Sequence, residues 1–309
     1  MKLFKLKAKH AAFLFACGFF LLSGYEAWNH YAGYREEQAT ETLLQNAPGN
    51  RNSKAVQKVL DRLQGKKSFR FYVIGDTQGS FSTFNKILQR AAAEKPDFII
   101  HAADITTGGR YRQYMKMVDF IEPLAIPVIF GIGNHDCSRR GREIFAHLFG
   151  PLDFYFDTGS CRFIFLDCNY EKINPDFIEL PQEPAQYDYL HGFDPDQISI
   201  LETLIKKDGY NFIIVHMPPA LDSFKHHSFN RNSRLFTDLM KKYARQIAAV
   251  FSGHIHGYGE AVSDGVPYVV SGGAGSRLHQ ARSGIASRLN YIVVTVDGAA
   301  ITRRVEFLD

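Results

Sequence analysis

The sequence of 309 residues predicts an α/β fold of two facing mixed β-sheets flanked by helices. In the first half of the chain, apolar runs that resemble strands alternate with helical patterns, which is the order of βαβ units. In the second half, short strand patterns predominate. Because 45% of the residues are hydrophobic, the chain can bury one sizeable core with extensions, but not two large domains.

Three strand–helix pairs make up the first half of this prediction. Each strand is a short apolar run, and each following helix has apolar residues at helical spacing. The loops after these strands matter most, because ligand-binding loops leave an α/β sheet at the carboxyl ends of its strands. The pairs are residues 69–75 with 81–93, 98–103 with 110–121, and 126–131 with 140–149.

The second half supplies most of the expected strands. Residues 154–156 and 162–167 have the pattern of a hairpin, and a long loop that contains proline follows over 169–191. Two further helices each precede a strand, and four short strands complete the tail. These elements are helices 195–207 and 231–244, strands 210–215 and 247–251, and tail strands 259–262, 267–271, 291–297 and 301–306.

The N-terminal residues have a different character. Four lysines in the first ten residues precede an uncharged run over 11–25, which is the pattern of a secretory signal or a signal anchor. The run is shorter than the ~20 residues that span a bilayer comfortably. Interfacial aromatic residues follow it, and no good cleavage site does, so an uncleaved anchor is favoured. A cleaved signal and a buried globular helix are the alternatives.

The charge distribution separates the N-terminal part from the rest. We expect an anchor or signal over residues 1–28, a stalk over 29–67 and one folded body over 68–309. Residues 1–67 carry 11 Lys and Arg against 5 Asp and Glu, whereas the whole chain has a net charge of only +4, so the body is slightly acidic. The body therefore lacks the basic balance of a protein that grips nucleic-acid backbones, and no nucleic-acid partner is expected. The positive-inside rule places the body outside the cytoplasm, either membrane-anchored or secreted.

The four cysteines are too few for a disulfide framework. Cys161 and Cys168 flank one predicted strand of roughly 23 Å, which is beyond disulfide reach. Cys137 and Cys168 should lie at the same edge of the fold, so a bond between them is conceivable outside the cytosol. Buried thiols are the alternative.

Polar clusters follow five of the predicted strands. Since these loops can converge at one edge of the fold, their side chains should lie together. They offer carboxylate, amide and imidazole donors without a required thiolate, a set that suits divalent ions such as Mn, Fe or Zn. The clusters are Asp76-Thr77-Gln78, Asp104, Gly133-Asn134-His135-Asp136, His216 and Gly253-His254-Ile255-His256.

In this order the clusters resemble the motifs of the calcineurin-like metallophosphoesterases. Those motifs are Asp-x-His, Gly-Asp, Gly-Asn-His-Asp/Glu, a single His and Gly-His-x-His. The resemblance covers about residues 68–280, and it implies a four-layer α/β/β/α sandwich with residues 68–309 as the catalytic domain. Gln78 stands where the family usually has His, and Ala103 where it usually has Gly. Because glutamine keeps an oxygen donor, we interpret Gln78 as a variant ligand.

The resemblance implies a binuclear metal centre that hydrolyses phosphate esters. Two divalent ions can hold a phosphoryl group from both sides and lower the pKa of a shared water, so that a metal-activated hydroxide attacks phosphorus. The implied ligands are Asp76, Gln78 and His256 for the first ion, Asn134, His216 and His254 for the second, and Asp104 as the bridge between them.

His135 and Asp136 are the predicted catalytic residues that need not bind metal. His135 follows an expected ligand, so it is held beside the ions, where an imidazole can protonate the leaving alkoxide. Asp136 could accept a hydrogen bond from the other ring nitrogen and fix the tautomer. A structural role for His135 is the alternative. Among the other histidines, His101 is expected in the core, and His226 and His227 at the rim of a substrate pocket or on the surface.

Two other functions remain open. The same site could serve a phosphodiesterase or a pyrophosphatase, because the metals treat the phosphoryl group alike and the pocket loops select the leaving group. A non-catalytic binding scaffold is the other alternative. Loss of metal ligands would mark it, since the fold alone does not determine function.

Overall fold

The computed structural model describes residues 25–169, 191–224, 227–281 and 284–308, and the account below concerns these residues. The chain divides into two compact units, Met1–Ala47 and Pro48–Asp309. In the first unit, residues 25–45 form a helix with exposed aromatic side chains, including Trp28, Tyr31 and Tyr34. The second unit contains both sheets.

The predicted membrane segment falls almost wholly outside this description. Of residues 11–25, only Tyr25 belongs to the described part of the chain. Within that part, no helix combines the length and the apolar character needed to cross a membrane.

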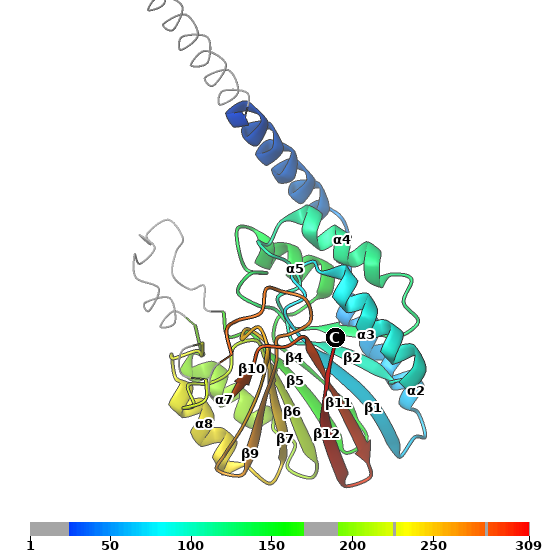
Figure 1. Cartoon of the computed structure of the whole chain (residues 1–309), viewed down its shortest axis with the longest axis vertical. Coiled ribbons are helices and arrows are strands. Elements are labelled where there is room, and N and C mark those ends of the chain that lie inside the picture. Colours follow the sequence, from blue (N-terminus) through cyan, green and yellow to red (C-terminus); the bar gives the residue numbers. More distant parts are fainter. Residues whose placement is uncertain (1–24, 170–190, 225–226, 282–283, 309) are drawn as a thin grey trace, which may run out of the picture. The chain divides into compact units, whose positions relative to one another are not determined.

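Two mixed sheets form the second unit (Figure 1). One has five strands in the order β12-β11-β1-β2-β3, and the other has seven in the order β10-β8-β9-β7-β6-β5-β4. The strands of the first are β1 (Ser68–Ile74), β2 (Phe98–His101), β3 (Val128–Phe130), β11 (Asn290–Asp297) and β12 (Ala300–Phe307). The strands of the second are β4 (Phe154–Thr158), β5 (Cys161–Leu166), β6 (Tyr210–Val215), β7 (Ile247–Ser252), β8 (Tyr258–Ser263), β9 (Val266–Ser271) and β10 (Ile285–Ala286). The prediction of two mixed sheets is therefore confirmed, and only the two-residue strand β10 was not expected.

An aromatic core joins the two sheets. The ring of Phe71 on β1 stacks on Phe98 of β2 at 5.0 Å and meets the rings of Phe163 on β5 and Phe212 on β6 edge-on, each at 5.2 Å. All four side chains are completely buried. Burial of such large rings is the main stabilising contribution of this layer, and it places the inner faces of the sheets against each other.

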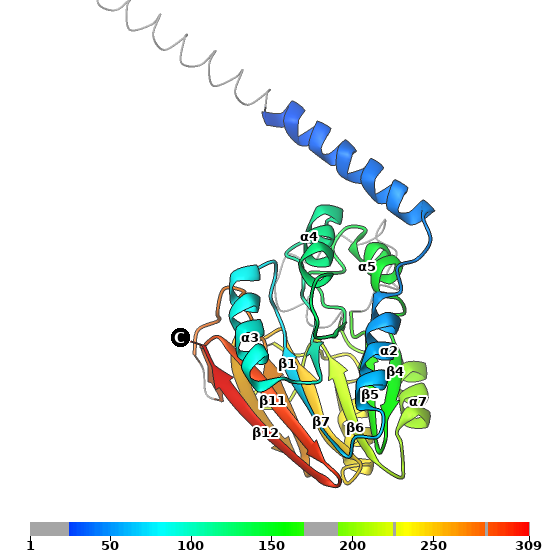
Figure 2. The ribbon, with the colours of Figure 1, turned by 90° about the vertical axis from the view of Figure 1, so that its right-hand side faces the viewer.

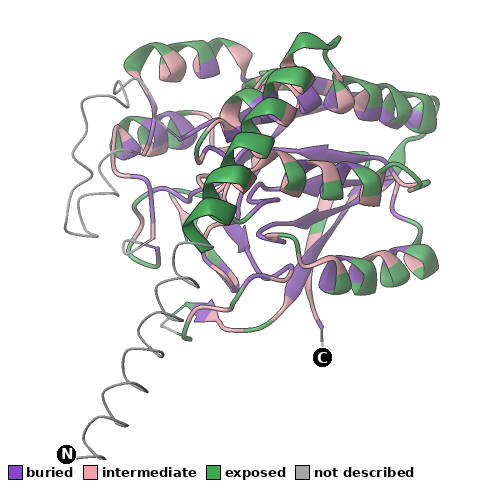
Figure 3. Cartoon of the chain, turned by 90° about the horizontal axis from the view of Figure 1, so that it is seen from above, coloured by how far each residue is buried: buried purple, intermediate pink, exposed green. Residues whose placement is uncertain are grey.

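Helices cover the outer faces of both sheets. On the five-stranded sheet, Phe84 of α3 (Phe81–Glu94) packs on His101 of β2, with ring centroids 6.0 Å apart. On the seven-stranded sheet, buried residues of α7 (Pro195–Leu204) and α8 (Ser233–Lys242) share a cluster with β5, β6 and β7. Figure 2 shows α3 and α7 on opposite sides of the sheets, and Figure 3 shows mostly buried strands with partly exposed helices around them. The four layers match the architecture that the resemblance implied.

Helix α2 (Arg51–Leu63) belongs to this second unit and not to a stalk. Its residues Ala55, Val59 and Leu63 are buried in the core between the sheets. These three residues are spaced four apart, which is a helical spacing, but the spacing does not say which surface they cover. The structure therefore divides the chain after Ala47, earlier than the expected end of the stalk at residue 67.

The described cysteines do not form a disulfide. Cys137, Cys161 and Cys168 are all buried thiols. For Cys137 and Cys168, the structure therefore shows buried thiols and not the disulfide that was the other expectation.

Candidate metal centre

The five polar clusters meet at one edge of the two sheets, held by hydrogen bonds between their loops. The backbone N–H of Asp76 donates to the carbonyl oxygen of Ala103, and that of Gln78 to the carbonyl oxygen of Asp104, both at 3.0 Å. In the other sheet, the N–H of Gly253 donates to the carbonyl oxygen of His216 at 2.9 Å. The loops after β1 and β2 thus continue side by side beyond the strands, as do those after β6 and β7.

Left-handed backbone conformations turn several expected ligands into the site. Asp76, Gln78, Asp104 and His254 have φ values of 60°, 44°, 54° and 63°. Few residues other than glycine adopt this region, and the strain is commonly found at functional sites. Ala103 also has a φ of 79°, which gives a physical reason for the glycine that the family usually has there.

Two glycines allow the loops to approach the carboxylates closely. A Cβ at Gly133 would lie 2.1 Å from Oδ1 of Asp104, and a Cβ at Gly253 would lie 2.3 Å from Oδ2 of Asp76. Any other residue would displace the carboxylate or the loop. The glycines before Asn134 and His254 are therefore required by packing around the two acids.

The expected ligands of the first ion lie together. Nε2 of His256 is 3.5 Å from Oδ1 of Asp76. Nε2 of Gln78 is 3.3 Å from Oδ2 of Asp104 and 3.4 Å from Nε2 of His256. In this orientation the amide of Gln78 presents its nitrogen, so coordination through Oε1 would require the amide to turn over.

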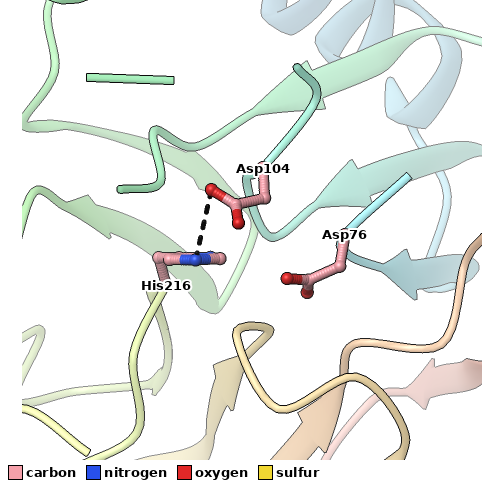
Figure 4. A group of neighbouring side chains, drawn as sticks. All are labelled: Asp76, Asp104 and His216. Atoms are coloured by element: carbon pink, nitrogen blue, oxygen red, sulfur yellow. Dashed lines mark ion pairs between the residues drawn. The ribbon is translucent and has the colours of Figure 1, made fainter. Parts of the chain in front are cut away.

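The expected ligands of the second ion form a neighbouring group. Oδ1 of Asn134 is 3.1 Å from both Nε2 of His216 and Nδ1 of His254. Nε2 of His216 is also 3.3 Å from Oδ1 of Asp104, so Asp104 belongs to both groups. Figure 4 shows His216 and Asp104 facing each other, with Asp76 beside them. Ligand atoms of these three residues all lie within 4.8 Å of one another.

The electrostatics of the two carboxylates favour a cation. Asp76 and Asp104 are completely buried, and their ion pairs in the described part of the chain are with imidazoles, not with lysine or arginine. Among the described residues, Oδ1 of Asp76 is buried and accepts no hydrogen bond, and Nε2 of His256 lies 3.5 Å from it. A buried carboxylate oxygen without a hydrogen bond is costly, and a coordinated ion removes that cost. The residues therefore fit the divalent metal centre that the resemblance implied.

The pKa shifts agree with this crowding of charge. Burial raises the pKa of Asp76. Burial would also raise the pKa of Asp104, but His216 outweighs it and lowers that pKa below its usual range. Conversely, burial would lower the pKa of His216, but Asp104 raises it to about 10. Burial lowers the pKa of His254 well below its usual value, which leaves a neutral imidazole that can bind a metal.

Backbone carbonyls orient two of the histidines. Nδ1 of His216 donates to the carbonyl oxygen of Ala102 at 3.0 Å, and Nδ1 of His256 donates to that of Arg277 at 2.7 Å. Because Nδ1 of each ring is engaged by a carbonyl, Nε2 is the atom that faces the carboxylates and remains to bind a metal once it has lost its proton. This is the usual way in which proteins fix the tautomer of a metal-binding histidine.

His135 and Asp136 do not form the expected pair. Nδ1 of His135 lies 3.0 Å from the carbonyl oxygen of Thr107, and its backbone N–H donates to Oδ1 of Asp104 at 3.0 Å. The carboxylate of Asp136 instead accepts the N–H groups of Ile105 and Thr106, at 3.2 and 2.9 Å.

Asp136 also accepts the N–H of Gly133, at 3.2 Å. It thus ties the loop that carries Asp104 to the loop that carries Asn134. Burial raises the pKa of this carboxyl group to about 7, and the nearby charge of Asp104 acts in the same direction.

The other histidines divide between core and site. His101 is completely buried, as expected, and its Nε2 lies 3.0 Å from the hydroxyl of Thr77. His227 reaches the site, because its ring lies 6.2 Å from that of His254. His226 lies outside the described residues.

Two further histidines at the site belong to none of the sequence motifs. The ring of His279 stacks on His256 with centroids 4.3 Å apart. His191 is near enough to His216 and Asp104 for their charges to influence its pKa, which burial lowers to about 4. Neither residue has a motif of its own, so only proximity reveals them.

The comparison with protein families agrees with the geometry. The family of calcineurin-like phosphoesterases matches residues 69–258 of the chain. That range covers more than half of the chain and includes all five polar clusters. The chain therefore belongs to the calcineurin-like phosphoesterase family, as its motifs indicated.

Individual relatives differ in their substrates. The chain is 26% identical over 187 residues to a 3',5'-cyclic adenosine monophosphate phosphodiesterase of Pseudomonas aeruginosa, covering 56% of this chain and 60% of that protein. It is 27% identical over 221 residues to a serine/threonine-protein phosphatase of Rattus norvegicus, covering 66% of each. The chain thus spans about three fifths to two thirds of the length of these relatives. A dimetal phosphatase structure from Danio rerio shares the fold, with a TM-score of 0.57, 14% identity, and coverage of 78% of this chain and 99% of that one.

Proposed function

We propose that this calcineurin-like phosphoesterase hydrolyses phosphate esters at a centre of two divalent metal ions. The observation that supports this most strongly is the arrangement of the expected ligands into two groups that share Asp104. A carboxylate with two oxygens can serve both groups at once, whereas the amide and imidazole ligands each serve one.

Seven side chains would hold the ions. The first ion would be bound by Asp76, Gln78, Asp104 and His256, and the second by Asp104, Asn134, His216 and His254. When bound, such a pair of ions lowers the pKa of water and neutralises charge on the phosphoryl group. Manganese, iron and zinc are the candidate metals, because the donors are oxygen and nitrogen atoms.

The protein's own catalytic group would be His135. The carbonyl of Thr107 engages Nδ1 of His135, so Nε2 is the atom that can hand a proton to the departing ester oxygen. The hydrogen bond from the backbone N–H of His135 to Asp104 keeps this imidazole beside the centre. Asp136 acts as a positioning residue, because it fixes the two loops that carry Asp104 and Asn134.

Metal analysis combined with a substrate panel tests this function. Protein stripped with a chelator should hydrolyse none of a set of phosphate monoesters, diesters and pyrophosphates, and added Mn, Fe, Co or Zn should restore hydrolysis of at least one class. Asp104→Asn should lose both metal and activity, whereas Asp119→Asn, the same change at an exposed aspartate, should lose neither. Full activity of metal-free protein would contradict the proposal.

For the N-terminal segment, we propose that residues 11–25 form an anchor or export signal that places the body outside the cytoplasm. The lysine-rich start and the uncharged run support this. An anchored chain should sediment with membranes and an exported chain should appear in the secreted fraction, and deletion of residues 1–24 should leave the protein in the cytoplasm. Cytoplasmic recovery of the full chain, protected from protease, would contradict the proposal.

A further inference from the structure

Five imidazole rings follow one another along the metal centre. His216 lies 5.2 Å from His254, His254 lies 6.2 Å from His227, His227 lies 4.8 Å from His279, and His279 lies 4.3 Å from His256, all measured between ring centroids. Three of these histidines are expected metal ligands. His227 and His279 are not, and they connect one end of the Gly-His-Ile-His motif to the other.

Two separate loops place these two histidines. His227 lies in the loop after β6, where its backbone N–H donates to the carbonyl oxygen of Phe224 at 2.9 Å. His279 follows β9, and its backbone N–H donates to the carbonyl oxygen of His256 at 2.9 Å. Both side chains are partly buried, so they are shielded by the protein yet still reachable from solvent.

Their position relative to His135 suggests a role. His135 contacts Asp104, whereas His279 packs on His256, which lies beside Asp76. The proposed general acid therefore contacts Asp104 itself, whereas the histidine pair lies against two expected metal ligands, His254 and His256. A phosphoryl group there would meet His135 at its leaving oxygen and would need other donors for its unesterified oxygens.

We propose that His227 and His279 form a subsite that binds the unesterified oxygens of a phosphate monoester. Stacking occupies ring faces, so the N–H groups on the ring edges are the parts that can reach a ligand. A monoester has three unesterified oxygens and a diester has two, so added donors favour the monoester. This inference rests on the proposed function and narrows its substrate class.

The competing explanation is that the pair only supports His256 by stacking. Substitution by phenylalanine separates the two roles, because it keeps an aromatic ring and removes the N–H donors. Substitution by glutamine does the reverse, since it keeps an N–H donor without the ring. His30→Phe is the matched control, because His30 is an exposed histidine of the first compact unit.

The test measures inorganic phosphate binding to the metal-loaded full chain by titration calorimetry. His227→Phe and His279→Phe should each raise the Kd for phosphate about tenfold to hundredfold, the usual value of a hydrogen bond to a charged group. Metal content should stay unchanged, and His227→Gln and His279→Gln should recover part of the affinity. For a monoester, KM should rise more than kcat falls, and a diester should be affected less.

Two outcomes would overturn the subsite. In the first, both phenylalanine variants bind phosphate as tightly as the wild type and His30→Phe do. In the second, these variants lose their metal together with their affinity for phosphate. The proposed function has a separate test. If the metal-loaded wild type binds phosphate through the pair but hydrolyses no ester, the result supports the subsite and contradicts the enzyme activity.

Discussion

The side chain of Asn52 pairs with the backbone of Phe130 through two hydrogen bonds. Nδ2 of Asn52 donates to the carbonyl oxygen of Phe130, and the N–H of Phe130 donates to Oδ1 of Asn52, both at 2.9 Å. Phe130 lies on β3, which is the last strand of the five-stranded sheet. Helix α2 therefore closes the edge of that sheet with a side chain where another strand would otherwise pair.

Asn52→Ala should lower the free energy of unfolding by about 2–4 kcal/mol, because it leaves a buried donor and a buried acceptor of Phe130 without partners. Denaturant titration measures the change. Gln57→Ala on the same helix is the control, since the hydrogen bond of Gln57 to Asp61 is exposed, and it should change the value by less than about 0.5 kcal/mol. Equal effects of the two substitutions would show that α2 does not close the sheet edge.

Two neighbouring alanines test the backbone strain at the site. Ala103 is held at a φ of 79°, whereas Ala102 is not among the residues with positive φ, and both are buried. Glycine at 103 relieves about 1–2 kcal/mol of left-handed strain. That gain roughly offsets the lost methyl group and the greater entropy of the unfolded chain.

Ala103→Gly should therefore be nearly neutral, and Ala102→Gly should lower the free energy of unfolding by about 1–2 kcal/mol. Thermal and denaturant unfolding of the two variants measures the difference. If Ala103→Gly is as destabilising as Ala102→Gly, position 103 is not strained.

His101 should make the protein less stable in acid. Burial lowers its folded pKa to about 3, below an unfolded value of about 6.5. As pH falls through 6.5, the unfolded chain gains a proton that the folded chain does not, so stability decreases until about pH 3. Between pH 7.5 and 5.5 the free energy of unfolding should fall by about 1.4 kcal/mol more in the wild type than in His101→Gln.

The control for this measurement is the exposed residue His30. In His30→Gln, the free energy of unfolding should depend on pH as it does in the wild type. If His101→Gln keeps it as well, then His101 takes up its proton in the folded state as readily as in the unfolded state.

His135→Ala should lower kcat by roughly 10²–10⁴, the usual contribution of a general acid, with metal content unchanged. For an ester with an activated leaving group, kcat should fall less, because the departing oxygen needs no proton. Steady-state kinetics on an alkyl and an aryl ester, with metal analysis, make the comparison. Equal losses for both esters together with loss of metal would assign His135 a structural role.

Gln78 should bind its ion more weakly than a histidine would, because an amide oxygen is a poorer donor than imidazole to Mn, Fe or Zn. Gln78→His should raise metal occupancy at a given free Mn concentration, and Gln78→Ala should lower it. Titration of metal content against free Mn compares the three proteins. Superimposable curves would mean that Gln78 keeps its contacts with Asp104 and His256 and does not coordinate the metal.

The sequence alone determined the order of the elements and the chemistry of the site. Strand β6 has the predicted bounds, β7 is one residue longer at its carboxyl end, and β1 begins and ends one residue earlier than predicted. Apolar periodicity and strand length are local properties, so a short stretch of chain is enough to reveal them. The same holds for the residue types that end each strand, which is why the clusters around Asp76, Asp104 and His216 could be named before any contact was known.

Only the tertiary structure decided which of these groups meet and what else joins them. In the structure, α2 belongs to the folded body, and the ring of His279 stacks on that of His256. Asp136 accepts hydrogen bonds from backbone N–H groups of two loops and not from His135. The tertiary structure also set the left-handed φ of Asp76 and Asp104. These features depend on the paths of loops and on contacts between residues distant in sequence, and no local pattern of residue types specifies them.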